Sequence, residues 1–278
     1  MPIVVNTNVA SLISQRNMGK AQAGLGVAFS RLSSGLRIDS AKDDATGLAI
    51  SENLRMQIRG FAIVERNSND AISMSQVAEG ALGEVADIVT RLRELAVQAA
   101  NGSYTTTDRS YLQIEFQSMQ AEIKRMMTAV KYNGVSVINF ASTALKFQIG
   151  IANVTSDRVI MTFGAIKLTA LLSATTRIGS SATNALTALG QIDAGLTKVV
   201  TVRARYGAFM NRLEATVANT QTMRLSASSA NSRIRDVDVA EETAALSRQQ
   251  VLSQSAAAIL AQANQAPQMA LSLLRGGN

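Results

Sequence analysis

The pattern of apolar positions divides the chain into helical ends and a different middle. In the first segment, small and apolar residues recur at alternating steps of three and four, which keeps one narrow seam toward a partner helix. The residues of this seam are Met18, Ala21, Leu25, Ala28 and Leu32. A glycine after two serines, followed by capping residues at 39–44, predicts a linker at about 33–45.

The same stepping predicts further long helices. One runs from near Ala45 to the helix-stop pair Asn101-Gly102, with Gly60 as a candidate kink. Its seam consists of Leu82, Val85, Val89, Leu92, Ala96 and Ala99. Other helices are predicted at about 108–130, 182–230 and 240–274, and Pro267 is expected to end or bend the last one. The 182–230 helix is expected to pair antiparallel with the helix that begins near Ala45.

The middle of the chain changes to the period of a β-strand. Between about 140 and 178, apolar residues alternate with polar ones. The alternating residues are Leu145, Phe147, Ile149 and Ile151, and then Val159, Met161 and Phe163. The predicted fold class is therefore mainly α: a long antiparallel helical rod or coiled coil made from paired N- and C-terminal segments, with a small β-rich central insert.

Both ends of the chain lack ionisable side chains. Residues 1–15 and 249–274 contain none, although both segments are rich in Gln, Ser, Asn and Ala. A surface helix normally carries charge on its free face, so such segments fit best among other protein helices. We expect self-association through the ends; the alternative is a pair of low-charge helices that fray in solvent.

The amino-acid composition argues against most kinds of catalytic and metal-binding site. The 278 residues include no Cys and no His, so Zn sites, thiol catalysis and Ser-His-Asp catalysis are not expected. The insert holds Asp157 as its sole acid, too few for an acid–base pair. No catalytic residue, cofactor or metal site is predicted. The net charge is +7, but the basic residues are scattered along the sequence, which disfavours nucleic-acid binding.

Targeting and membrane signals are also missing from the sequence. No stretch reaches the ~20 apolar residues of a membrane-spanning helix. The start, MPIVVNTNVASLISQ, has no basic segment followed by an apolar one, so the general secretory route is not expected. If the chain leaves the cell, it uses a route that reads some other signal.

Both ends resemble one protein family. The N-terminal segment VVNTNVASLISQRNMGKAQAGLGVAFSRLSSGLRIDSAKDDATGLAISENL closely resembles the N-terminal region of bacterial flagellins. The segments SASSANSRIRDVD and AEETAALSRQQVLSQSAAAILAQANQAPQMALSLL resemble the flagellin C-terminus equally closely. The resemblance covers about 1–140 and 190–278.

The resemblance implies a subunit that self-assembles into the bacterial flagellar filament, the propeller for swimming. It implies an inner coiled-coil domain from 1–44 and 235–278, a rod domain from 45–140 and 190–234, and a short variable outer insert at 141–189. It also implies secretion through the flagellar type III export apparatus to an extracellular filament. The implied partners are further copies of the chain, an export chaperone, the filament cap and the hook-junction proteins, with neither nucleic acid nor membrane insertion.

Three groups of residues are candidate contact sites. Packing between subunits in the inner coiled coil is assigned to Met18, Leu25, Leu32, Leu252, Ile259, Leu260 and Leu271. Polar contacts between subunits at the linker are assigned to Arg31, Asp43 and Asp44. The resemblance further implies a patch for Toll-like receptor 5, an animal innate immune receptor, at Arg91, Leu95 and Glu115.

Alternatives remain for the patch and for the whole chain. Thr90 stands where a Gln is usual in the receptor motif, and Arg91 and Glu115 also read as ordinary solvated charges, with Leu95 in a rod interface. For the chain, the nearest alternative is the junction protein between hook and filament, which shares flagellin-like ends. A membrane-active helical protein is another, although the Lys/Arg-rich polar face of such helices is missing.

Overall fold

The chain forms two compact units. A computed structural model describes the backbone of residues 7–139, 142–164, 166, 168–173 and 175–275, and the side chains of these residues except 142 and 266–275. The first unit comprises 1–56 and 226–278, and the second comprises 57–225. The borders between the units fall inside two helices, α2 (Ala45–Ala100) and α4 (Ala182–Arg235).

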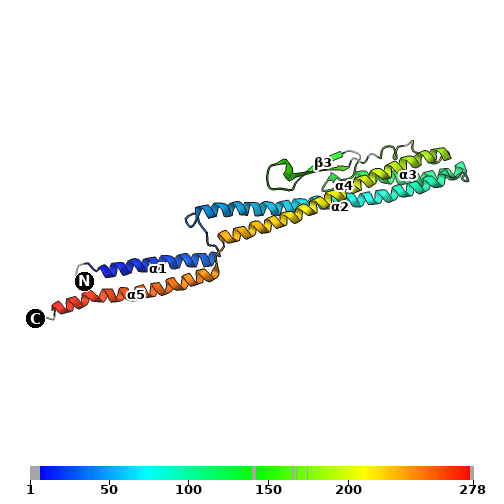
Figure 1. Cartoon of the computed structure of the whole chain (residues 1–278). Coiled ribbons are helices and arrows are strands. Elements are labelled where there is room, and N and C mark those ends of the chain that lie inside the picture. The colour runs from blue at the N-terminus through cyan, green and yellow to red at the C-terminus, as the bar shows by residue number, and fades with distance from the viewer. Residues whose placement is uncertain (1–6, 140–141, 165, 167, 174, 276–278) are drawn as a thin grey trace. The chain divides into compact units, whose positions relative to one another are not determined.

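In the first unit, helices α1 (Val9–Ser34) and α5 (Val239–Arg275) lie side by side and antiparallel (Figure 1). At one end of the pair, Asn8 Nδ2 donates a hydrogen bond of 2.8 Å to the Ala263 carbonyl. At the other end, Arg31 Nη1 lies 3.7 Å from Glu242 Oε2. Ala21 and Ala28, two of the predicted seam residues of α1, are buried.

Local sequence fixes the ends of α1. The Asn8 side chain caps its start by accepting from the Ser11 amide, and Gly35 ends it in a left-handed conformation with φ 70°. The linker that follows is anchored by backbone hydrogen bonds, one from Arg37 N to Arg235 O at 2.6 Å. The linker predicted at about 33–45 corresponds to the observed gap between Ser34 and Ala45.

The second unit is built on α2, α3 (Thr106–Ala129) and α4. The predicted seam of α2 is entirely buried: Leu82, Val85, Val89, Leu92, Ala96 and Ala99. Ion pairs join α2 to α4 in opposite chain directions, through Arg93–Asp193 at 2.8 Å, Glu79–Arg203 at 2.6 Å and Glu65–Arg224 at 2.8 Å. The prediction that these two helices pair antiparallel is therefore confirmed.

A β-hairpin packs on the helices of the second unit. Strands β3 (Ser142–Gln148) and β4 (Arg158–Gly164) are antiparallel, with Leu145 opposite Met161. Two shorter strands, β1 (Lys131–Tyr132) and β2 (Val135–Ser136), form a separate pair, and a 3₁₀ turn spans Thr155–Asp157. The buried Phe163 of β4 lies 5.5 Å from the Tyr206 ring of α4, measured between ring centroids. The predicted fold class, mainly α with a small β-rich insert, is confirmed.

Three element boundaries differ from the predictions. Strand β3 ends at Gln148, because the Gln148 side chain donates to the Gly150 and Ala152 carbonyls and holds a loop at 150–152. Helix α4 continues to Arg235 instead of ending near residue 230, because Asp238 caps α5 and only 236–238 separate the two helices. Helix α5 does not end at Pro267, since it runs to Arg275.

Candidate assembly surface

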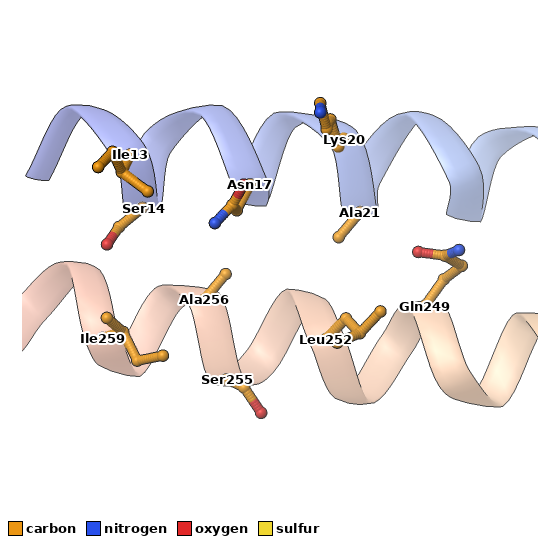
Figure 2. A pocket seen from close by; sticks show the side chains of 10 residues that line it. All are labelled: Ile13, Ser14, Asn17, Lys20, Ala21, Gln249, Leu252, Ser255, Ala256 and Ile259. Carbon is orange, nitrogen blue, oxygen red and sulfur yellow. The ribbon is translucent and has the colours of Figure 1, made fainter. Parts of the chain in front are cut away.

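A groove of about 510 Å³ lies between α1 and α5 in the first unit. Figure 2 shows Ala21 and Ala256 pointing toward the opposite helix, so small side chains line the floor between the two ribbons. The groove is lined by Ile13, Ser14, Asn17, Lys20, Ala21, Gln249, Leu252, Ser255, Ala256 and Ile259. Because its floor is built from Ala and Ser, the two helices leave space that larger side chains from elsewhere can fill.

Large apolar side chains remain exposed on both helices of this unit. Ile259 is 55% exposed and Phe29 is 57% exposed. The remaining members of this apolar surface are Val9, Leu12, Ile13, Val27, Val239, Val251 and Leu252. Complete burial of such a side chain is worth about 1.5–3 kcal/mol, and about half of that remains for each of these half-exposed residues, so together they favour association with other protein helices.

The predicted inner-coil residues fall into two groups. Met18, Leu25 and Leu32 are half-buried on the seam of α1, and Leu260 is half-buried on α5. Leu252 and Ile259 are exposed on α5. The side chain of Leu271 lies outside the described residues.

The predicted linker residues already have partners inside the chain. Arg31 faces Glu242, and Asp44 Oδ1 accepts from the Gly47 amide at 2.9 Å, which caps the start of α2. Asp43 Oδ2 accepts from both the amide and the hydroxyl of Ser40 at 3.0 Å. These hydrogen bonds, the backbone one above all, lower the pKa of Asp43 below its ordinary value. All three residues therefore hold the linker and its neighbours within the chain.

Sequence reasoning missed a charged cluster in the same unit. Glu52 Oε1 accepts from Arg235 Nη1 at 2.6 Å and from Arg55 Nη1 at 2.7 Å, and these bonds, led by that from Arg235, lower the pKa of Glu52. Sequence reasoning also missed a hydrogen bond between α1 and α5, which Ser11 Oγ donates to Asn264 Oδ1 at 2.8 Å. The signal for Ser14 and Ser11 was their place four and seven residues before Met18, which continues the seam, but serine was not counted as a seam residue.

The predicted receptor patch is only partly assembled at the surface. Arg91 of α2 donates to Glu115 Oε1 of α3 through Nε at 3.0 Å and Nη2 at 2.8 Å. Hydrogen bonds from Arg91 to Glu94 and Glu115 raise the pKa of the guanidinium above its ordinary value. Leu95 is 1% exposed and belongs to the core of the second unit.

The described residues contain no group of three or more His, Cys, Asp and Glu side chains placed to hold a metal ion. Within the same part of the chain, each helix is too polar or too short in its apolar stretches to cross a bilayer. The first unit presents a surface with many exposed apolar side chains on paired terminal helices, and the 249–274 stretch of α5 contributes no ionisable side chain to it. Such a surface defines a self-assembling helical protein.

Comparisons with known proteins give the family. The model for the bacterial flagellin N-terminal helical region matches residues 5–143, and that for the bacterial flagellin C-terminal helical region matches 189–274. The chain belongs to the bacterial flagellin family. Strand β4 and most of β3 lie between the two matched regions.

Two relatives show how complete the similarity is. The flagellar filament 33 kDa core protein of Treponema phagedenis is 38% identical over 290 residues, covering 98% of this chain and all of the relative. The flagellin of Halalkalibacterium halodurans is 40% identical over 274 residues with the same coverage. The chain is accordingly a structural subunit of the bacterial flagellar filament, which serves motility, with a reduced central region.

A solved structure of a flagellar hook-associated protein from Vibrio parahaemolyticus shares the fold. It matches 70% of this chain and all of its own with a TM-score of 0.58, but only 16% of residues are identical. That likeness concerns the fold alone. The full-length identity to filament proteins supports a filament subunit, and nothing in the comparisons supports the junction-protein or membrane-active alternatives.

Proposed function

We propose that α1 and α5 form the inner coiled coil of the filament and that their exposed apolar side chains pack against the same helices of neighbouring copies. The observation that carries this proposal is the coincidence of exposed Leu252 and Ile259 with a stretch, 249–274, that has no ionisable side chain. Water is a poor environment for such a surface, whereas a ring of similar helices removes it from water. Leu260 and Leu271 belong to the same proposed contact.

The remaining residues do not take part in that contact, and we assign them to the outer layers of the filament. Residues 45–140 with 190–234 form the rod layer around the inner coil, and 141–189 face outward as the variable insert. The dense core of the second unit supports a rod that is stable before assembly, while the polar bonds at Arg31, Asp43 and Asp44 support a linker that keeps its shape within one subunit.

The test replaces two exposed residues on α5, Leu252→Ser and Ile259→Ser, in the full chain. We expect soluble monomer with unchanged tyrosine spectra and no filament growth on short filament seeds, scored by electron microscopy. Ile160→Ser is the matched control, because Ile160 is 57% exposed on the hairpin, which the proposal places on the outside. Normal filaments from the double variant, or equal loss in the control, would refute the assigned packing surface.

A further part of the proposal concerns secretion and the partners of export. We infer that the chain leaves the cell through the flagellar export apparatus and meets an export chaperone, the filament cap and hook-junction proteins on its way. A monomer whose terminal helices are incompletely covered benefits from a chaperone until it reaches the growing end. The absence of Cys and His from the sequence supports a purely structural role without catalysis.

Recognition by Toll-like receptor 5 is a second proposal, supported by the ion pair that displays Arg91 and Glu115 from two helices. Leu95 enters it only indirectly, since its side chain is buried in the core of the second unit. We expect Arg91→Ala to reduce receptor signalling by purified monomer. Arg93→Ala is the control, because Arg93 is an exposed arginine of the same helix whose ion-pair partner is Asp193 of α4. Unchanged signalling in the Arg91→Ala protein would leave the pair a purely structural contact.

A further inference from the structure

The positive charge of this protein is concentrated in one segment. Residues 124–212 contain eleven Lys and Arg residues and two Asp residues, a net charge of +9, while the whole chain carries +7. The remainder is therefore slightly acidic, at −2. The basic residues are scattered along the sequence, so the concentration becomes a surface only if the fold gathers them.

The two acids of the segment neutralise little of this charge. Asp193 Oδ1 accepts from Arg93 of α2 at 2.8 Å, and Asp157 Oδ2 accepts from the Ala152 amide at 2.7 Å within its own loop. Acids from outside the segment pair with Arg125 and Arg203, through Glu122 and Glu79 respectively.

The hairpin presents two of the basic residues on its outer face. Val159, Met161 and Phe163 of β4 are buried, so the alternate residues of both strands face away from the core. On that outer face, Lys146 is opposite Ile160, and the next pair contains Arg158 opposite Gln148, which makes Lys146 and Arg158 diagonal neighbours. Arg158 donates to Gln148 Oε1 at 3.1 Å and to Asn153 Oδ1 at 2.6 Å, neutral groups that leave its charge uncompensated.

Helix α4 carries a basic stripe beside this face. Lys198, Arg205 and Arg212 are exposed and recur every seven residues, which places them on one side of the helix about 10.5 Å apart along its axis. Arg205 lines a pocket of about 240 Å³ together with Ile160 and Thr162 of the hairpin's outer face, so stripe and hairpin are contiguous. Among the described residues, Arg205 and Arg212 have no ion-pair partner.

We propose that this cationic surface, formed by Lys146, Arg158, Lys198, Arg205 and Arg212, binds an acidic polysaccharide. A linear glycan with carboxylate or sulfate groups repeats its charge about once per disaccharide, which suits widely spaced cations in a row better than the dense phosphates of nucleic acid. The proposal rests on the filament assignment, because only a hairpin on the outside of a filament can meet a polymer in the surroundings.

Other anionic partners fit the surface less well. Single-stranded nucleic acids are held by stacking on aromatic side chains, and the exposed large aromatics among the described residues, Phe29 and Tyr111, both lie outside 124–212. A membrane surface requires a helix with a broad apolar face beside its cations, whereas the exposed residues beside this stripe of α4 include the polar Thr197, Thr201 and Asn211.

The test measures binding of hyaluronan, a linear polysaccharide with one carboxylate per disaccharide, to monomers and to assembled filaments over a range of salt. We expect the double variant Arg205→Gln, Arg212→Gln to weaken binding roughly tenfold at low salt. The slope of log K against log salt concentration should fall in magnitude by about two, one for each ionic contact removed. The control is Arg59→Gln with Arg66→Gln on α2, which removes the same charge from two exposed arginines that are also seven residues apart. Neutral dextran should not bind.

Three other outcomes would overturn the proposal. Equal weakening by both double variants would mean that net charge alone drives binding. Tighter binding of duplex DNA, or of vesicles of phosphatidylglycerol and phosphatidylcholine, would assign the surface to another class of partner. Binding by monomers but not by filaments would mean that assembly covers the surface. Filament formation, scored separately by electron microscopy, tests the filament assignment, so failure there is distinguishable from failure of glycan binding.

Discussion

The two units of this chain use apolar side chains in opposite ways. In the second unit, residues such as Phe116 and Leu82 are 0% exposed and hold the helices and hairpin together. In the first unit, Leu252 and Phe29 are about half exposed although they lie on paired helices. One unit has a core that one chain completes, and the other has an apolar surface that we propose is covered by further copies. Stability and assembly should therefore respond to different substitutions.

The largest effect is expected from shortening the first unit. Removing residues 269–278 deletes the end of the uncharged terminal segment while leaving the second unit intact. We expect complete loss of filament growth on seeds, because the proposed inner coil loses contact area in every copy. All four tyrosines lie in the second unit, so tyrosine fluorescence should report an unchanged unfolding midpoint. Filaments of ordinary length from the shortened chain would contradict the division of roles.

The converse substitution acts on the second unit. Phe116 of α3 is fully buried in its core, and Phe116→Ala should lower the free energy of unfolding by about 3–5 kcal/mol because it leaves a cavity. Urea unfolding followed by tyrosine fluorescence measures this loss. Phe29→Ala in α1 is the matched control, and since Phe29 is 57% exposed we expect little change in the same signal. Comparable losses from both would mean that the units do not differ in packing.

Periodicity made the second unit the more predictable of the two. The seam from Leu82 to Ala99 follows heptad steps, and burial along it is decided by neighbours in the same chain. Leu95 lies between Leu92 and Ala96 in the sequence and is buried with them in the core of the second unit, as the sequence alternative of a rod interface for Leu95 anticipated.

The first unit and the hairpin were less predictable for physical reasons. Which side of α5 remains exposed depends on where α1 lies, and one sequence does not distinguish a partner helix in the same chain from one in the next. The end of β3 is set by side-chain bonds from Gln148 to the following loop, which break an alternation that continues through Ile151. The cationic surface likewise depends on α4 lying beside the hairpin, which spacing along the sequence did not reveal.

A smaller effect is expected from pH on the second unit. Burial raises the pKa of Tyr206 from 10.0 to about 12. Between these values the unfolded state has lost the phenol proton and the folded state keeps it, so the unfolded state binds fewer protons and stability falls as pH rises. The loss begins near pH 10 and should reach roughly 2 kcal/mol at pH 12.

Tyr206→Phe separates this contribution from the titration of lysines. The variant loses the hydrogen bond to the Val137 carbonyl, which should cost about 1 kcal/mol near neutral pH. Its unfolding free energy should then fall less steeply than that of the unchanged protein between pH 10 and 12. Since the first unit has no tyrosine, filament growth at neutral pH should be unaffected, and parallel pH curves for the two proteins would disprove the buried-phenol account.

The smallest effect is expected where the second unit is polar. Glu79 and Arg203 join α2 to α4 at 2.6 Å, but their side chains are 34% and 39% exposed. Because solvent screens such pairs, a double-mutant cycle with Glu79→Gln and Arg203→Gln should give a coupling of about 0–1 kcal/mol. A coupling well above that range would mean that the ion pairs, in addition to the buried apolar seam, stabilise the packing of α2 against α4. The same cycle on Glu122 and Arg125 provides the reference, because both residues of this pair lie within α3.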